Sequence, residues 1–220
     1  MSDAKKGATR RPMVCYVTDR KPLGASDAVR AVLEKIRAAA EAGADWVQLR
    51  EKDLPARALL ELARRAVAIG QAKVFVNDRL DVALASGAAG VHLGRESMPA
   101  NEAIRWCRAG NAPPEFLMGV SCHSMEEARE AQAAGADYIF FGPVFETPSK
   151  QEFGAPQGIA RLAEVCRASK IPAMAIGGIN EKNATECLRA GAAGIAAIRL
   201  FQEAPDAAAL KTLIAALHIA

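Results

Sequence analysis

Ala42–Val47 reads AGADWV, and this phrase decides the fold because it returns three more times along the chain. The other copies are SGAAGV at Ser86–Val91, AGADYI at Ala134–Ile139 and AGAAGI at Ala190–Ile195. Each copy ends a helical pattern with a Gly-Ala turn and opens a short run of strand formers. Their first glycines stand 44, 48 and 56 residues apart, a spacing that suits two strand–helix units per repeat. Four such repeats predict eight strands and eight helices, the closed (βα)₈ TIM barrel of α/β class, in a single domain.

Eight apolar runs supply the strands that this count requires. They are short and mostly lack alternation, as expected of parallel strands buried on both faces. They lie at Met13–Thr18, Trp46–Leu49, Lys73–Val76, Gly90–Leu93, Phe116–Ser121, Tyr138–Gly142, Ala173–Ile176 and Gly194–Ile198. Between them, Ser26 is expected to cap a helix that runs to Ala42, and SMEE at Ser124–Glu127 matches the capping box. We assign residues 1–11 to a flexible N-terminal tail and residues 12–220 to the barrel.

Composition narrows the classes of protein to consider. The 220 residues are 51% hydrophobic but only 5% aromatic, so we expect a core of Ala, Val, Leu and Ile. A net charge of +3, with scattered Lys and Arg, gives no case for a nucleic-acid surface. No apolar run reaches the roughly 18 residues that span a bilayer, and the polar, basic start does not resemble a signal peptide. Five cysteines without a C-x-x-C pair indicate free thiols in a reducing cytoplasm.

Charged residues follow the second run. Alternation directs Gln48, Arg50 and Lys52 to one side. An amide and two cations at a barrel mouth form an anion site, in which Arg50 offers a planar fork and Lys52 a point charge. The alternative is a solvated cluster in which the cations pair with Glu51 and Asp53.

Asp78 follows the third run, directly after Asn77. A carboxylate at the end of a barrel strand can hold Mg²⁺ against a phosphate group. The alternative is an ordinary N-cap of the next helix.

The fifth run ends with Ser121, Cys122 and His123. Ser121 is a candidate donor to an anion, and His123 is a candidate proton carrier. The sequence offers no recognisable acidic partner, so it does not predict a Ser-His-Asp triad. Cys122 and His123 are neighbours on a strand and point to opposite faces, which argues against a thiolate pair.

The longest strand-to-helix connection, Pro143–Gln157, follows the sixth run, and we interpret it as a lid. Thr147, Ser149 and Lys150 lie in it, and two hydroxyls with an ammonium suit closure over a phosphate. The alternative is an ordinary polar loop.

Gly177 and Gly178 follow the seventh run. Paired glycines let backbone N–H groups approach a ligand, and the loops after strands seven and eight of such barrels often bind phosphate. The alternative is a tight left-handed turn. Together with the cations across the mouth, this predicts two anion-binding regions, which suits the joining of one phosphorylated substrate to another.

An ordered set of motifs resembles the thiamine phosphate synthase family. The set is YVTD at Tyr16–Asp19, QLREK at Gln48–Lys52, NDR at Asn77–Arg79, GVHLG at Gly90–Gly94, GVS at Gly119–Ser121, GPVF at Gly142–Phe145 with Thr147 and Lys150, and IGGI at Ile176–Ile179. The resemblance extends from about Met13 to the final helix. It implies a (βα)₈ barrel that couples hydroxymethylpyrimidine diphosphate to hydroxyethylthiazole phosphate with the aid of Mg²⁺. The implied reaction is dissociative and needs no protein nucleophile.

The resemblance also implies roles for single residues. The pyrimidine diphosphate would be bound by Gln48, Arg50, Lys52, Asn77, Ser121 and Lys150, and the thiazole phosphate by Thr147, Ser149, Gly178, Ile198 and Arg199. Arg50, Lys52, Ser121 and Lys150 form the implied catalytic set, which stabilises charge on the leaving diphosphate. Asp78 is the implied ligand of Mg²⁺.

Two positions depart from the family pattern. Ser97 stands where the family usually has a second aspartate ligand, so Glu96, Ser97 or water would complete the metal shell. Arg199 stands where the family usually has a serine, and its fork could bind the thiazole phosphate instead.

These departures leave alternatives open. The related thiazole tautomerase shifts a proton on thiazole carboxylate phosphate without a metal, and His123 would then carry the proton. The presence of Lys52, Asn77 and Asp78 favours the synthase, because a tautomerase has little use for these three residues. A regulatory barrel that binds thiazole phosphate without turnover is a third hypothesis. The sequence leaves a monomer and a homo-oligomer such as a C₂ dimer equally open.

Overall fold

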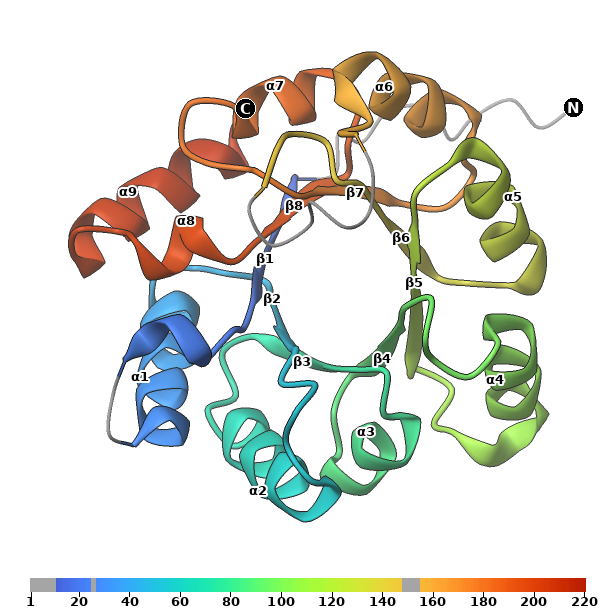
Figure 1. Cartoon of the computed structure of the whole chain (residues 1–220), viewed down its shortest axis with the longest axis horizontal. Helices are drawn as coiled ribbons and strands as arrows, with labels where there is room; N and C mark the ends of the chain where they lie inside the picture. The colour runs from blue at the N-terminus through green and yellow to red at the C-terminus, as the bar shows by residue number, and fades with distance from the viewer. Residues whose placement is uncertain (1–10, 25–26, 148–154) are drawn as a thin grey trace, which may run out of the picture.

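Eight parallel strands close into a barrel in chain order, and helices surround it (Figure 1). The computed structural model describes residues 11–24, 27–147 and 155–220. β1 closes the barrel by pairing with β8, where Val14 lies opposite Ile195. In chain order the elements are β1 Met13–Val17, η1 Lys21–Leu23, α1 Ala28–Glu41, β2 Trp46–Leu49, α2 Ala56–Val67, β3 Lys73–Asn77, α3 Leu80–Ser86, β4 Gly90–Leu93, α4 Ala100–Trp106, η2 Cys107–Asn111, β5 Leu117–Cys122, α5 Met125–Ala134, β6 Tyr138–Phe141, α6 Gly158–Ala168, β7 Ala173–Ile176, α7 Ala184–Arg189, β8 Gly194–Ala197, α8 Arg199–Gln202 and α9 Ala207–His218.

The predicted (βα)₈ fold is confirmed, and every predicted strand agrees with the observed one to within one residue at each end. The predicted cap of α1 is wrong: Asp27 caps this helix by accepting from Arg30 N at 2.9 Å, and Ser26 lies outside the described residues. The capping box at α5 forms, since Ser124 Oγ accepts from Glu127 N at 3.1 Å. The Glu127 carboxylate accepts from the N–H of His123 rather than from that of Ser124.

The repeated phrase lies where even-numbered strands begin. In two copies its aspartate ties the chain to the preceding strand. Asp45 Oδ2 accepts from Val14 N at 2.9 Å, and Asp137 Oδ2 accepts from Met118 N at 2.7 Å. Both aspartates also pair with bases, Asp45 with Arg11 and His218, and Asp137 with Arg108. Of the predicted tail, residues 1–10 lie outside the described part of the chain.

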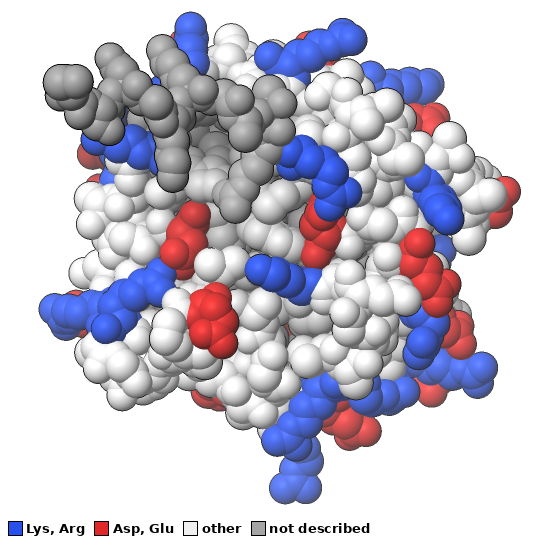
Figure 2. Space-filling view, turned by 180° about the vertical axis from the view of Figure 1, so that it is seen from behind, with Lys and Arg blue, Asp and Glu red and all other residues white. Residues whose placement is uncertain are grey.

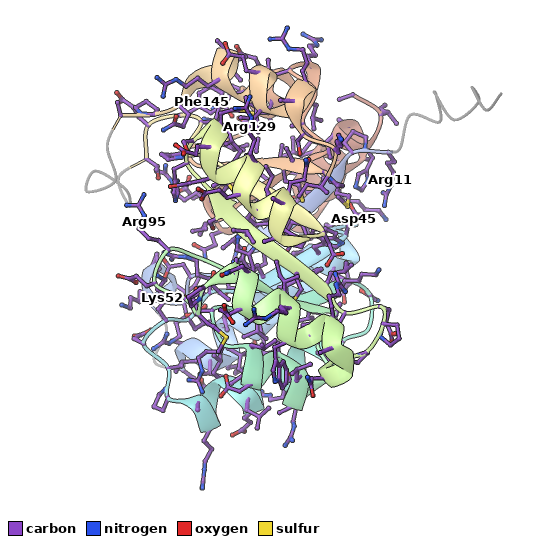
Figure 3. The ribbon with its side chains drawn as sticks, turned by 90° about the vertical axis from the view of Figure 1, so that its right-hand side faces the viewer. Arg11, Asp45, Lys52, Arg95, Arg129 and Phe145 are labelled. Carbon is purple, nitrogen blue, oxygen red and sulfur yellow. The ribbon has the colours of Figure 1, made fainter. Side chains whose placement is uncertain are left out.

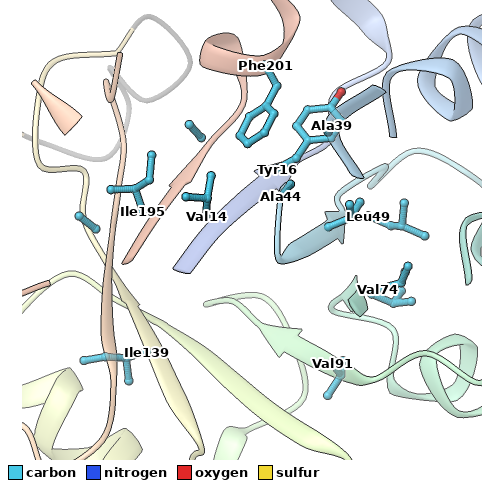
Figure 4. Close-up of a cluster of buried hydrophobic side chains, with 14 of the residues drawn as sticks. Val14, Tyr16, Ala39, Ala44, Leu49, Val74, Val91, Ile139, Ile195 and Phe201 are labelled. Carbon is cyan, nitrogen blue, oxygen red and sulfur yellow. The ribbon is translucent and has the colours of Figure 1, made fainter. Parts of the chain in front are cut away.

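An aliphatic layer fills the space between the strands and the helices (Figure 4). Val14, Val74, Val91, Ile139 and Ile195 point outward from their strands and are buried against the helices. Burial of such a side chain stabilises the fold by about 1.5–3 kcal/mol. This layer is the core that the composition predicts.

The interior of the barrel differs from that expectation, because Trp46, Phe75, Tyr138 and Phe140 pack together there. The Trp46 ring lies 4.7 Å from that of Phe75 and 4.8 Å from that of Tyr138. Glycines on neighbouring strands make room for the rings. A Cβ at Gly119 would lie 2.1 Å from Tyr138 Cζ, and a Cβ at Gly90 would lie 2.8 Å from Phe75 Cε1. Aromatic side chains therefore form the floor beneath the end of the barrel where the strands finish.

The surface charges and the cysteines of the described residues do not by themselves indicate a further binding or catalytic site. Lys and Arg alternate with Asp and Glu on the visible part of the face in Figure 2. Within the described ranges, no helix combines the length and apolarity that crossing a bilayer requires. All five cysteines are free thiols. Burial raises the pKa of Cys122 and Cys187 to about 12 and that of Cys166 to about 11, so these thiols are poor nucleophiles.

Candidate functional site

The predicted site residues lie at the end of the barrel where the strands finish, which we call the mouth. Figure 3 shows Lys52, Arg95 and Phe145 at this end, with Arg11 and Asp45 at the opposite end. In barrels of this type the loops that follow the strands carry the reactive groups, whereas the opposite end serves stability.

A central pocket of about 380 Å³ opens at the mouth. It brings together residues that are far apart in the sequence. The predicted residues that line it are Gln48, Arg50, Asn77, Ser121, Thr147, Gly178, Ile198 and Arg199. Ser149 and Lys150 lie outside the described residues, as do residues 148–154 of the predicted lid.

Lys52 and Asp78 line a smaller pocket of about 220 Å³ that shares Asn77 with the central one. Lys52 Nζ lies 3.2 Å from Glu96 Oε2 and 3.9 Å from Asp78 Oδ2. Strand alternation therefore predicts the side-chain direction only as far as Arg50, because β2 ends at Leu49. Lys52 lies beside the central pocket rather than in it.

A hydrogen-bonded chain of side chains connects the two pockets. Gln48 Nε2 donates to Asn77 Oδ1 at 2.7 Å, and Asn77 Nδ2 donates to Asp78 Oδ2 at 2.5 Å. Gln48 is 3% exposed, and its Oε1 has no partner among the described residues. A buried acceptor without a partner is costly, so this atom is suited to a donor on a ligand.

Asp78 is held in a strained conformation at the end of β3. Its φ of 62° is in the left-handed region, where no other non-glycine residue of the described chain lies. Its Oδ1 accepts from Ser97 Oγ, and also from Gly94 N at 3.3 Å. The N-cap alternative is wrong, because α3 begins after Arg79 and its first turn receives no side-chain cap.

Ser97 rather than Glu96 lies next to the Asp78 carboxylate. Ser97 Oγ donates to Asp78 and accepts from Gly94 N at 2.7 Å. The Glu96 side chain is 82% exposed and pairs with Lys52. The described residues contain no group of three or more His, Cys, Asp or Glu that would form a complete metal cage.

Glu51 and Asp53 do not pair with the cations of their own segment. Both bind Arg20, whose Nη1 lies 3.0 Å from Glu51 Oε2 and 2.7 Å from Asp53 Oδ1. Hydrogen bonds from Arg20 hold the pKa of Asp53 at about 2. The predicted alternative of a local charge cluster is therefore wrong, and no ion pair of Arg50 forms within the described residues.

Gly177 and Gly178 agree with both predicted alternatives, a left-handed turn and a position beside a ligand pocket. Gly177 and Gly178 have φ values of 96° and 68°, so they form a left-handed turn, and both also line the central pocket. A Cβ at Gly178 would lie 2.5 Å from Glu146 O. Phe145 N donates to Gly177 O at 3.0 Å, which anchors the start of the β6–α6 connection on this turn.

The structure separates two histidines that the sequence places near the mouth. His123 bonds through Nδ1 to Gly142 O and lines a different pocket, of about 370 Å³. His92 is 1% exposed and lines the central pocket. Its Nε2 lies 2.9 Å from Ser121 Oγ, and its Nδ1 lies 3.3 Å from Tyr138 Oη. His92 is not among the predicted site residues, although a polar residue inside an apolar barrel strand was a usable signal.

Other pocket residues carry no local signal. Asp19, Gln202 and Glu203 line the central pocket. Gln202 Nε2 donates to Asp19 O at 2.6 Å and to Tyr16 Oη at 3.2 Å, which joins α8 to the end of β1. Only closure of the barrel brings these segments together.

Comparisons with known proteins agree on one family. A family model described as thiamine monophosphate synthase matches residues 14–201. A Geobacter sulfurreducens protein provisionally named thiamine-phosphate synthase is 48% identical and covers 86% of this chain and 86% of its own. The thiamine-phosphate synthase of Moorella thermoacetica is 43% identical over 88% of this chain and 90% of its own. The solved thiamine phosphate pyrophosphorylase of Pyrococcus furiosus has a TM-score of 0.77 and 33% identity, covering 95% of this chain and 98% of that one.

Proposed function

Because this chain belongs to the thiamine monophosphate synthase family, we propose that its mouth joins hydroxymethylpyrimidine diphosphate to hydroxyethylthiazole phosphate. The products are thiamine phosphate and pyrophosphate. The names of its relatives support the synthase interpretation over the tautomerase alternative. The observation that carries the proposal is the pair of adjoining pockets. Together they contain the cations Arg50 and Lys52, the carboxylate of Asp78 on its strained backbone, and the buried Gln48 Oε1, which has no hydrogen-bond partner among the described residues.

The diphosphate half of the site is assigned to the side of the mouth formed by β2, β3 and β5. Arg50 offers a guanidinium that no described carboxylate neutralises, and Lys52 lies in the adjoining pocket. Ser121 supplies a hydroxyl from β5. Gln48 Oε1 faces this region as an acceptor, which suits an amino group on the pyrimidine ring. Lys150 keeps its proposed role in this half, although it lies outside the described residues.

The thiazole phosphate half is assigned to the opposite wall. Thr147, Gly178, Ile198 and Arg199 line the pocket there. Arg199 begins α8, and its planar fork can bind a phosphate in place of the serine that the family usually has. Ser149 is proposed for this half as well and lies outside the described residues.

Mg²⁺ is the proposed cofactor, and the donors present fit it. Asp78 supplies a carboxylate and Ser97 a hydroxyl beside it, both of them hard oxygen donors. Mg²⁺ is commonly bound by one or two carboxylates together with substrate phosphates and water, so a complete protein cage is not required. When bound there, the ion would neutralise charge on the leaving diphosphate.

The chain's own groups stabilise and shelter the reaction. Arg50 and Lys52 stabilise the negative charge that grows on the diphosphate as it leaves. His92 and Phe140 form part of the buried pocket floor, their rings 4.3 Å apart, and exclude water from the reacting carbon. No protein nucleophile is needed if the reaction is dissociative. His123 lies outside the central pocket, which further disfavours the tautomerase alternative.

The remaining assignments are coarser. We propose two small phosphorylated molecules as partners, and neither nucleic acid nor a membrane. Free thiols at all five cysteines support a cytoplasmic location. Whether the chain forms a homo-oligomer is tested by its mass in solution.

The function is tested by incubating the purified protein with both phosphorylated substrates and Mg²⁺ and measuring pyrophosphate. Release that requires both substrates and stops on chelation of the metal supports the proposal. No release with or without metal overturns it. A parallel incubation with thiazole carboxylate phosphate in chelator tests the tautomerase alternative, for which we expect no turnover.

A further inference from the structure

A polar network connects the ends of β1 and β2 beneath the mouth. It consists of Thr18, Arg20, Glu51 and Asp53, which we call the clamp. Thr18 is 0% exposed and Glu51 is 4% exposed, so this part of the clamp is a core feature, whereas Asp53 lies at its exposed edge. Thr18 Oγ1 donates to Glu51 Oε1 at 2.6 Å. Arg20 contacts the other oxygen of Glu51 through its backbone N at 3.3 Å and its Nη1 at 3.0 Å.

The clamp holds the backbone of Arg50. Thr18 Oγ1 accepts from Arg50 N at 3.0 Å while it donates to Glu51. The hydroxyl therefore uses its donor and an acceptor position at once, and both are specified by buried partners. Since Glu51 is drawn toward β1, the preceding side chain, Arg50, is directed into the central pocket.

The clamp also keeps Glu51 and Asp53 away from Arg50. Glu51 and Asp53 flank Lys52 in the sequence and are the nearest acids along the chain to Arg50. Arg20 binds both of them, Asp53 in a bidentate pair at 2.7 and 2.9 Å. A bidentate guanidinium–carboxylate pair is geometrically specific, so these acids are occupied. Neither of these two acids therefore competes with an external anion for Arg50, which forms no ion pair within the described residues.

We propose that Thr18, Glu51 and Arg20 are positioning residues for the diphosphate subsite, an inference that rests on the proposed function. The clamp fixes the direction of Arg50 and removes the local acids that would otherwise neutralise it. It acts through the position of Arg50, although Glu51 also lines the smaller pocket beside Lys52. Its loss therefore weakens binding of the diphosphate and leaves binding of the thiazole phosphate unchanged.

The test compares Thr18→Val with Thr18→Ser. Valine keeps the volume but removes the hydroxyl, and serine restores it. For Thr18→Val we expect KM for the pyrimidine diphosphate and Kd for inorganic pyrophosphate, measured by calorimetry, each to rise about tenfold. KM for the thiazole phosphate should stay within about twofold, and Thr18→Ser should resemble the wild type in all three constants.

A second variant keeps the proposal testable if Thr18→Val does not fold. Arg20→Gln releases both carboxylates and should raise the same two constants. Its matched control is Arg108→Gln at the opposite end of the barrel, because Arg108 also binds an aspartate there, with its Nη2 at 2.7 Å from both oxygens of Asp137. Arg108→Gln should lower the melting temperature without changing either substrate's KM.

The proposal is overturned if folded Thr18→Val or Arg20→Gln binds pyrophosphate as the wild type does. It is also overturned if both KM values rise together, or if Arg108→Gln produces the same selective loss. The pyrophosphate titration needs no turnover. A wild type that binds pyrophosphate but makes no thiamine phosphate would therefore contradict the proposed function while the clamp is still tested.

Discussion

The two ends of the barrel treat charged and polar groups in opposite ways. Where the strands begin, Asp45 and Asp137 each accept a backbone N–H and each bind a base, so their charge is satisfied within the protein. At the mouth, Arg50 has no described ion-pair partner and Gln48 Oε1 is buried without one. The difference supports our proposal that the mouth binds a ligand and that the opposite end serves stability, since unsatisfied buried groups cost free energy unless a ligand completes them.

The strongest way to break this comparison is to remove the strained carboxylate at the mouth. Asp78→Asn keeps a residue that tolerates the left-handed conformation but removes the charge. We expect kcat/KM to fall about 100-fold or more. The reason is that the proposed Mg²⁺ loses its carboxylate ligand and no longer neutralises the charge on the leaving diphosphate. The measurement is pyrophosphate release at saturating Mg²⁺, with thermal unfolding to verify the fold.

Asp81→Asn is the matched control, since Asp81 lies nearby in the first turn of α3 and its exposed side chain pairs with Arg79. This variant should keep full activity. Full activity in Asp78→Asn would instead remove Asp78 from the site.

A substitution in the turn formed by Gly177 and Gly178 tests the same difference between the two ends of the barrel, with a smaller expected effect. In Gly178→Ala the new Cβ would meet Glu146 O, so the start of the β6–α6 connection must shift. We expect KM for the thiazole phosphate to rise about tenfold, with KM for the diphosphate little changed.

Gly87→Ala has a similar φ of 72° but no atom within 4 Å of the new Cβ. It should cost about 1 kcal/mol of stability through backbone strain alone and leave both KM values unchanged. Equal kinetic effects from the two variants would show that Gly178 serves only the turn.

At the opposite end, Asp137→Ala should affect stability and not catalysis. It removes the acceptor for Met118 N and the partner of Arg108. We expect the free energy of unfolding in urea to fall by about 2 kcal/mol, since a partly buried donor loses a charged acceptor. A selective change in either KM would contradict the division between the two ends.

The smallest expected effect concerns how the stability of the fold changes at low pH. Arg20 lowers the pKa of Asp53 to about 2, below the usual value of about 4 for Asp. A carboxyl with a lowered folded pKa stabilises the fold above the unfolded pKa, and this contribution is lost as the pH falls from about 4 toward 2. Asp53 is exposed, so the effect is small and screened by salt. The melting temperatures of wild type and Asp53→Asn should differ at pH 5 and converge only below about pH 2, and a constant difference would contradict this assignment.

Much of the fold was predictable because its signals are local. The four copies of the Gly-Ala phrase mark where helices end and strands begin, and short apolar runs such as Trp46–Leu49 have one plausible structure between them. The cap of α1 was missed because Ser26 and Asp27 are both good caps, and local preference does not choose between neighbours. The aromatic barrel interior was missed because composition gives an average, whereas a packed layer is filled by whichever strand positions face inward.

The site was predictable wherever a strand end specifies a direction. Gln48 and Arg50 lie in the central pocket as alternation requires, but Lys52 lies beyond the end of β2 and takes its place from Glu96 and Asp78. His92 could have been found as a polar residue within an apolar strand. Gln202 could not, because its contact with Asp19 depends on closure of the whole barrel.

The sequence by itself determined the eightfold barrel, the family and the end at which we propose that the chemistry lies, because period, turn glycines and motifs are properties of adjacent residues. Only the tertiary structure decided which acids are occupied and which cations are available. The sequence places Glu51 and Asp53 beside Arg50 and Lys52, whereas the folded chain gives both acids to Arg20. The physical reason is that an ion pair forms with the partner that geometry and burial favour, and that partner comes from another strand.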